Sequence, residues 1–540
     1  MLVAGPVLAR FGDRAVAATP SPAPGLPPRH EVWSWQQQLV DFGTRYTGSP
    51  GHDRFVDWLS EQFGRVPGMA TVRDRHTFNR WLARSWSLQV NQPASAGRSG
   101  PVPLTYYYPY SGTTTEAGVS GPLVDLGTYA PAVPGTSGTG YTPEFWAPAK
   151  GGIALVRSAP STFPLAVGQA ATGGYEPGKS SGQAAADYER YIAAMTNPAF
   201  QGIFYPIPLL DARNAGVLGV VCVWTGMPDD EVANQYNPFI TPYATASGLA
   251  TPGDPGCPAV WVGEATGASL ARGAATRQAT ATLRLTADIT AGAATDTVWG
   301  VLKGDSPGSG NLIVNTHTDG PNATEENGAL GMLALAQRAA RLPQRRRDLY
   351  FVMVTGHFQL PQFTRTIPLA RPEVGSDATS VWMLDHPGSY QAARAGVTVE
   401  HLGCTRWDID PQTGGYEAVG GFEWGATYTE QHEGSLNPVN FEQQAYLDAV
   451  GAVNAAGGID YPVATLGPGP VYLGEGAPLY AGGLGTVSLC PAPTYLLQAG
   501  DPRRPDLLDL DKLDADLMYG QIAALARTLD TFDSAPDEMF

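Results

Sequence analysis

The sequence predicts an α/β fold in which a mixed, mostly parallel central sheet is flanked by helices and interrupted by an inserted β-rich domain. From about residue 295, apolar runs of strand length alternate with amphipathic helical segments, a pattern typical of a parallel sheet covered on both faces. Between residues 106 and 290, short β runs are instead separated by Gly, Pro and Thr. The 540 residues also exceed what one ordinary core accommodates.

The segment before the β-rich region is expected to begin the main domain. Apolar side chains recur at helical spacing in residues 31–46 and 52–64, which predicts two helices. The Gly/Pro sequence RYTGSPG between them predicts a turn. We therefore assign residues 31–105 and 291–540 to one domain and residues 106–290 to the insert.

The second part of the main domain supplies the expected parallel strands. The apolar runs NLIVNTH, DLYFVMV, GVTVEH and GTVSLC predict strands, and ENGALGMLALAQRAARL predicts a helix between the first two. In open sheets of this kind, ligands bind beyond the carboxyl ends of the strands. Polar residues follow the first three runs, so a functional site is expected at that edge.

Composition and charge exclude two classes of partner. The net charge of −17 repels phosphate backbones, which argues against nucleic-acid binding. No run of 18 or more apolar residues is present, so we expect no membrane span.

The N-terminus and the cysteines bear on the compartment. Residues 1–30 contain an apolar, small-residue run that leads to Ala15-Val16-Ala17 and then to a Pro-rich linker, which resembles the end of a secretory signal. We therefore expect a secreted protein. In that compartment the four cysteines either form two bridges or remain buried thiols. The pairs within predicted domains are Cys222–Cys257 and Cys404–Cys490.

The sequence NTHTDGPNATEENG contains the clearest candidate for a metal site. It follows a predicted buried strand and presents His317 and Asp319, and then Glu325 and Glu326 where a helix begins. Zinc accepts such nitrogen and oxygen ligands, and Asp319 can orient the His317 ring. Helix capping by acidic residues would explain the glutamates, but not the preceding His-x-Asp.

Two further strand ends carry ionisable groups. His357 follows the run DLYFVMV, and Glu400-His401 follows VTV. A single histidine at a strand end is usually structural. Three polar ends in one predicted parallel sheet favour a shared site.

The order of these motifs resembles the zinc-dependent aminopeptidases of metallopeptidase family twenty-eight. The resemblance rests on RYTGSPG, the His-x-Asp of NTHTDG, the acidic-Asn-Gly helix start and the two later strand ends, and it spans roughly residues 31–535. GGIALVRSA, NAGVLGVVCVW and CPAVWVGEATGASL resemble strands of the protease-associated domain that many members contain. The resemblance implies a zinc-dependent peptidase fold with that domain inserted.

The resemblance also implies which metal ligands remain. His317, Glu326 and Glu400 match the ligands of one zinc, and Asp319 lies behind His317. The glutamates that would supply the catalytic base and a ligand of the second zinc are replaced by His357-Phe358. The final histidine ligand, expected near Tyr495, is absent. We therefore expect one zinc, or another divalent ion, rather than two.

The roles of several residues stay open at this point. His357 stands at the catalytic-base position and is either a general base or a fourth ligand. Asp385 or His386 competes with Glu400 as the later ligand, since the spacing is long. Candidates for substrate contacts are Glu475, His432 and Tyr495.

Three functional hypotheses follow. The first is a secreted, mononuclear metal-dependent hydrolase that cleaves a peptide or small amide bond. The second is an inactive relative that acts as a binding protein. The third is a one-metal, non-hydrolytic enzyme, by weak analogy with glutaminyl cyclases.

Overall fold

The computed structural model describes the main sheet and most of the helices around it. The described residues are 23–129, 143–158, 171–175, 207–226, 229–236, 244–245, 248–249, 256–363, 377–410, 412–423, 425–428, 440–456, 462–466 and 474–540. Residues 1–22 of the expected signal segment lie outside these ranges. Among the helices within them, none has both the length and the apolar character needed to cross a membrane.

A mixed sheet of 12 strands runs through the molecule and confirms the expected fold class. Its main-domain strands are β19 (Gly485–Leu489), β14 (Ala393–Val399), β12 (Asn311–His317), β13 (Asp348–Val354) and β11 (Thr280–Leu302). The first four are adjacent in that order and parallel, whereas β11 pairs antiparallel with β13. Their carboxyl ends therefore meet at one edge.

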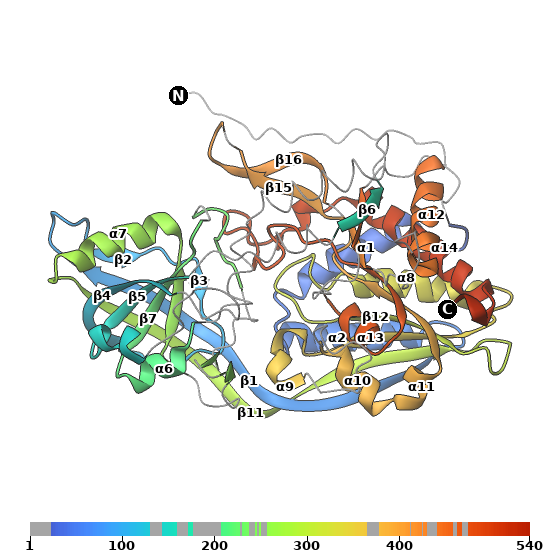
Figure 1. Cartoon of the computed structure of the whole chain (residues 1–540), viewed down its shortest axis with the longest axis horizontal. Helices are drawn as coiled ribbons and strands as arrows, with labels where there is room; N and C mark the ends of the chain where they lie inside the picture. Colours follow the sequence, from blue (N-terminus) through green and yellow to red (C-terminus); the bar gives the residue numbers. More distant parts are fainter. Residues whose placement is uncertain are drawn as a thin grey trace.

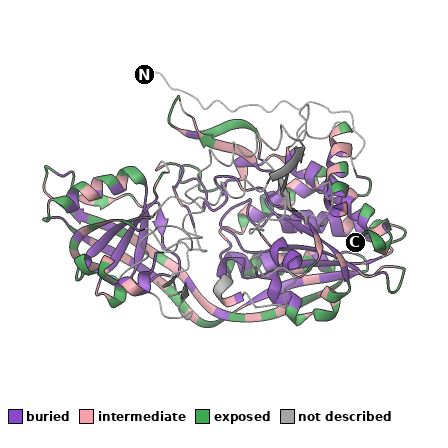
Figure 2. Cartoon of the chain, in the orientation of Figure 1, coloured by how far each residue is buried: buried purple, intermediate pink, exposed green. Residues whose placement is uncertain are grey.

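Helices cover both faces of this part of the sheet. One face packs against α1 (Arg29–Asp41), α2 (Pro50–Gly64), α8 (Gly328–Arg341), α12 (Phe441–Ala455) and α14 (Ala515–Ser534). The other face packs against α10 (Thr379–Asp385) and α13 (Gly476–Ala481). Leu312 and Val314 of β12 face the first layer and Ile313 faces the second, as strand alternation requires. Buried positions accordingly fill the strands and the inner sides of the helices (Figure 2).

The sheet continues into a second lobe, on the left in Figure 1. This lobe contains β3 (Tyr106–Tyr107), β4 (Val119–Tyr129), β5 (Ile153–Ser158), β7 (Gly219–Val223) and β10 (Ala259–Val262), with α6 (Leu209–Asn214) and α7 (Glu264–Ala275). The long antiparallel pair of β1 (Ala70–Asn91) and β11 joins the lobes. The predicted domain boundary at residue 290 lies inside the continuous strand β11, and the division into domains stays a prediction.

Shorter elements complete the described chain. The other strands are β2 (Gly100–Val102), β6 (Ala171–Tyr175), β8 (Ala244–Thr245), β9 (Gly248–Leu249), β15 (Thr405–Ile409), β16 (Tyr416–Phe422), β17 (Gly425–Tyr428) and β18 (Val463–Leu466). The other helices are α9 (Leu360–Phe363) and α11 (Pro387–Gln391), with 3-10 turns η1 (Pro143–Phe145), η2 (Ala147–Ala149), η4 (His357–Gln359), η5 (Leu510–Lys512) and η6 (Asp537–Met539). All four cysteines are buried free thiols, which is the second of the two alternatives that the sequence left open.

The start of α8 packs directly against the end of β14. A Cβ atom added to Gly328 would lie 1.8 Å from the backbone oxygen of Val399. Only glycine permits this approach, which sets the distance between the helix and the strand end that carries Glu400.

We expect Gly328→Ala to destabilise the protein by about 1–3 kcal/mol or more, because backbone atoms of two packed elements must separate. The matched control is Gly451→Ala in α12, where an added Cβ meets nothing within 4 Å. That control should raise the free energy of unfolding by up to about 1 kcal/mol. Urea unfolding of both variants measures the difference, and equal stabilities would contradict the close packing.

A buried histidine connects α2 to the end of β12. His52 Nδ1 accepts a hydrogen bond from Gly48 N–H at 3.0 Å, and its Nε2 lies 2.8 Å from Thr318 Oγ1, to which it donates. Burial lowers the pKa of His52 from 6.5 to about 4. The folded protein therefore holds this ring neutral at pH values where the unfolded chain protonates it.

The stability of the protein should fall as the pH decreases from 6.5 towards 4, because only the unfolded state takes up a proton at His52. The depressed pKa corresponds to about 3 kcal/mol, present above pH 6.5 and lost across this window. Denaturant unfolding at several pH values measures it. The variant His52→Gln should show a shallower pH dependence, and an unchanged slope would refute this origin.

Candidate metal centre

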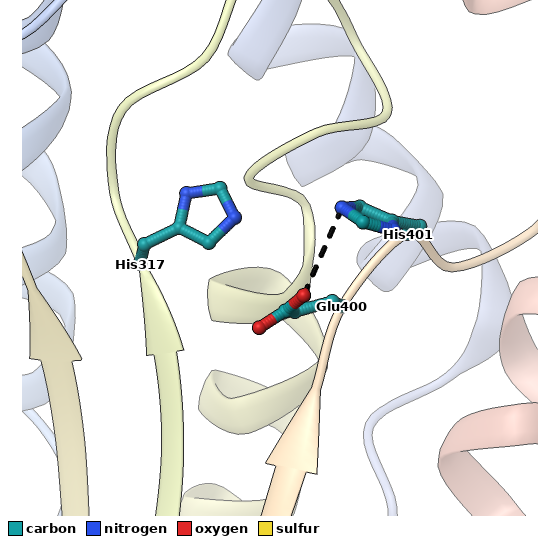
Figure 3. A group of neighbouring side chains, drawn as sticks. All are labelled: His317, Glu400 and His401. Atoms are coloured by element: carbon teal, nitrogen blue, oxygen red, sulfur yellow. Dashed lines mark ion pairs between the residues drawn. The ribbon is translucent and has the colours of Figure 1, made fainter. Parts of the chain in front are cut away.

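The carboxyl ends of neighbouring parallel strands bring several ionisable side chains together. His317 ends β12, His357 follows β13, Glu400 and His401 follow β14, and Cys490 follows β19. All five residues are buried. Figure 3 shows that the side chains of His317, Glu400 and His401 converge on one space.

His317 presents an unprotonated nitrogen to this space. Its Nδ1 donates to the backbone oxygen of Asp319 at 2.9 Å, so Nε2 carries the lone pair. Nε2 is buried and has no hydrogen-bond partner among the residues that the structure describes. Burial, followed by the charges of His357 and His401, lowers the pKa of His317 well below its usual value. The ring is therefore neutral, as a metal ligand must be.

Asp319 acts differently from the expected carboxylate behind His317. Its backbone oxygen, not its side chain, orients the ring. The carboxylate instead accepts from Thr47 Oγ1 at 2.5 Å, Phe358 N–H at 3.0 Å and His357 N–H at 3.3 Å. Asp319 thereby fixes the turn after β13, because its carboxylate accepts from two successive N–H groups at the start of that turn.

Glu400 and His401 are held by short contacts on either side. Glu400 Oε1 accepts from Glu475 N–H at 2.7 Å, and Oε2 accepts from the Cys490 thiol at 3.1 Å. Burial raises the pKa of Cys490 well above its usual value, so this thiol keeps its proton. His401 Nδ1 donates to Pro491 O at 2.5 Å, and its Nε2 lies 3.9 Å from Glu400 Oε2 (Figure 3).

Of the two glutamates at the start of α8, Glu325 faces the histidines. Its Oε2 lies 3.4 Å from His401 Nε2, and its Oε1 lies 4.0 Å from His357 Nε2. Burial lowers the pKa of His401, but the carboxylates of Glu325 and Glu400 outweigh it and raise that pKa. The expected ligand Glu326 instead forms an ion pair with Arg45, and both side chains are 0% exposed.

His357 lies against two carboxylates. Its Nδ1 is 3.0 Å from Asp377 Oδ1 and 3.1 Å from Glu475 Oε1, and its ring stacks on that of His317 with centroids 4.1 Å apart. Burial opposes protonation of His357, but Asp377 and Glu475 raise its pKa well above the usual value. Burial and the charge of Asp377 raise the pKa of Glu475 to about 8.

Two of the three predicted substrate-binding residues bind other groups of the protein, and the third lies outside the described residues. Both oxygens of Glu475 are used, since Oε2 accepts from the N–H and hydroxyl of Thr379 at 2.8 and 2.5 Å. The Tyr495 hydroxyl is buried, 2.9 and 3.0 Å from the backbone oxygens of Thr405 and Lys512. His432 lies outside the described residues.

Neither the alternatives to Glu400 nor the residues at the positions of the second-zinc ligands add a donor atom to the cluster. Asp385 is exposed at the end of α10, and His386 Nε2 pairs with Asp74 Oδ2 at 2.6 Å. Phe358 and Leu497 belong to an apolar cluster that also contains Tyr236 of the second lobe.

The donor set fits a metal ion. In the described part of the chain, three groups have ligand atoms within 4.8 Å of one another: His317 with Glu400 and His401, His317 with Glu325 and His357, and His357 with Asp377 and Glu475. The first two share a buried imidazole nitrogen with no hydrogen bond. Nitrogen and carboxylate donors of this kind suit zinc.

Sequence reasoning brought His317, His357 and Glu400 to one edge but assigned no role to four other residues. His401 had a visible signal, since it directly follows Glu400 at a strand end. Glu325 was one residue from the chosen position, and Arg45 lies in the RYTGSPG turn. Nothing in the local sequence distinguished Asp377.

The Arg45–Glu326 pair yields a stability prediction. Arg45→Met should lower the free energy of unfolding by about 3–5 kcal/mol, because it leaves a buried carboxylate without its counter-charge. The double variant Arg45→Met/Glu326→Gln should recover part of that loss. Unfolding of both singles and the double gives the coupling energy.

The same variants test the placement of Glu326. Glu326→Gln should keep the zinc affinity of the wild-type protein, measured by titration of the metal-free protein. Loss of zinc binding in this variant would make Glu326 a ligand after all, and simple additivity of the two stability effects would contradict the ion pair.

Comparison with known proteins identifies the fold of the chain. No protein-family model and no curated protein matches the sequence. Solved structures of other proteins are similar over almost the whole chain. An aminopeptidase from Aneurinibacillus sp. strain AM-1 is 13% identical, with a TM-score of 0.54, over 94% of this chain and 94% of that one.

Two further structures have comparable coverage and TM-scores. A zinc aminopeptidase from Bacillus subtilis is 15% identical over 95% of this chain and 98% of that one, with a TM-score of 0.54. A peptidase M28 precursor from Shewanella amazonensis SB2B is 13% identical over 94% and 98%, with a TM-score of 0.55. The chain thus has the fold of zinc aminopeptidases, as the sequence motifs predicted.

Proposed function

We propose that the protein is a secreted, zinc-dependent, peptidase-like hydrolase that uses one metal ion. The observation that carries this proposal is the buried convergence of His317 and Glu400 from adjacent strand ends, with the Nε2 atom of His317 left without a hydrogen bond in the described structure. A buried site that gathers imidazole and carboxylate donors favours a bound cation, which offsets the carboxylate charge. The fold shared with zinc aminopeptidases supports zinc as that cation.

His317 and Glu400 would hold the ion. A bound zinc ion supplies a Lewis acid that activates water and polarises a carbonyl group. Phe358 cannot ligate a metal, so the proposal contains one ion rather than two. The substrate is then a peptide or a small amide.

His357 is the proton-transfer group in this proposal. Asp377 and Glu475 both contact Nδ1, so that nitrogen carries the hydrogen. Nε2 faces Glu325 and the donor space, our name for the space on which His317, Glu400 and His401 converge. The carboxylates raise the pKa of His357, whereas a cation beside His317 would lower it again by repulsion. With the ion bound, His357 can therefore accept and return a proton near neutral pH.

We expect the protein purified without chelators to contain about one zinc per chain and to cleave peptides with free N-termini or small amides. His357→Ala should keep the metal but lower kcat by about 10²–10⁴-fold, because only proton transfer is removed. Elemental analysis and a panel of free and N-blocked peptides measure both properties.

The control is His386→Ala, which removes a histidine that is paired with Asp74 outside the cluster. This variant should keep both metal content and turnover. Absence of metal from the wild-type protein, or metal without any turnover, would favour a binding protein instead. Metal loss in His357→Ala would make His357 a ligand.

A further inference from the structure

His401 shares the end of β14 with Glu400, yet the two side chains approach the donor space from different sides (Figure 3). The atoms involved are His401 Nε2 and Glu400 Oε2, 3.9 Å apart. A zinc ion bonded to both would draw them to about 3.4 Å. The required movement is therefore about half an ångström, within the reach of small side-chain rotations.

The tautomer of His401 is fixed in the form that a metal needs. A carbonyl oxygen can only accept, so the 2.5 Å contact with Pro491 O places the hydrogen on Nδ1. In the neutral ring, which is the form that a metal binds, the lone pair is then on Nε2. A backbone carbonyl behind the ring is the arrangement that orients histidine ligands in metal sites, and His317 has the same arrangement through Asp319 O.

His401 Nε2 lies among the carboxylates of the cluster. The atom is buried and has no hydrogen-bond partner in the described part of the chain. Glu325 Oε2, 3.4 Å away, is likewise buried and forms an ion pair with this nitrogen when the ring is protonated. Two carboxylates and two imidazole nitrogens thus face one buried space, where a bound cation would offset the carboxylate charge.

The backbone at His401 is also unusual. Its φ is 55°, in the left-handed region that non-glycine residues rarely adopt. Such a conformation persists when surrounding contacts determine it, and it is common at ligand sites. Here Asn327 accepts Leu402 N–H at 2.7 Å and Gln521 accepts Gly403 N–H at 2.8 Å. These bonds hold the turn that directs His401 towards Glu325.

We infer that His401 is the third protein ligand of the metal, so that His317, Glu400 and His401 form a site of two imidazoles and one glutamate. This inference rests on the proposed function and deepens it. Two histidines and one glutamate are a known donor set of catalytic zinc sites, which keep a fourth position open. Glu325 and His357 border that fourth position.

A ligand at position 401 would let the chain bind a metal without the final histidine that the family has near the position of Tyr495. Glu326 is neutralised by Arg45, and Leu496 and Leu497 offer no donor atom. His401 supplies the missing nitrogen from a different strand end. Among the described histidines, only His357 and His401 are grouped with His317 by ligand atoms within 4.8 Å of one another.

The test compares zinc binding to metal-free wild-type protein and to His401→Asn. Asparagine tolerates a positive φ, so this variant removes the imidazole without straining the turn. Zinc affinity should fall by more than about 100-fold, the upper range for losing a supporting group behind a ligand. X-ray absorption should count two imidazoles on the metal in the wild type and one in the variant. The matched control His386→Asn should bind zinc like the wild type.

Each outcome separates this inference from the proposed function. Wild-type affinity and an unchanged imidazole count in His401→Asn would overturn the inference alone. Metal that depends on His401, in a protein that cleaves no peptide, would support it and remove the proposed activity. A wild-type protein without metal affinity would overturn both. If His401→Asn does not fold, the count in His357→Ala decides, with two imidazoles in support and one against.

Discussion

The buried ion pair between Arg45 and Glu326 is the interaction on which the rest of the site depends. Arg45 lies in the turn between α1 and α2, and its backbone exchanges two hydrogen bonds with Gly320. Its guanidinium also contacts Asn322 O and Glu326. Burial lowers the pKa of Arg45 to about 9, so the side chain remains charged at neutral pH. Because neither charge can be buried alone, the pair fixes the loop between β12 and α8.

Several site residues take their positions from that fixed loop. Asn322 donates to the backbone oxygens of Tyr495, Leu496 and Gln498, and Asn327 bonds both backbone groups of Leu402. The first contact holds the chain after β19, and the second holds the turn that carries His401. Polar groups in a dry interior normally find partners. In the described part of the chain, the buried His317 Nε2 has no hydrogen-bond partner, as expected where a ligand supplies the missing interaction.

The sequence predicted what periodicity and strand ends encode. The alternation of strands and helices led to the α/β sheet, and the position of polar residues after strands brought His317, His357 and Glu400 together. It could not choose between Glu325 and Glu326, because adjacent residues in a turn point in directions that only tertiary contacts decide. Arg45, about 280 residues earlier in the chain, makes that decision. The continuity of β11 across residue 290 was hidden because short apolar runs resemble separate strands.

Glu475 connects the candidate metal ligand Glu400 to His357, the proposed proton-transfer group. Its N–H binds Glu400 Oε1 while its carboxylate contacts His357 Nδ1, so one residue sets the distance between the two functions. The pKa of Glu475 is raised to about 8 and that of His357 lies well above its usual value, so these two contacting groups affect each other's protonation. A positive charge beside His317 favours release of a proton from this pair of groups, and an added proton opposes binding of a cation. In the proposed site, metal binding and proton transfer would therefore be linked through Glu475, whose carboxylate contacts His357 and Thr379.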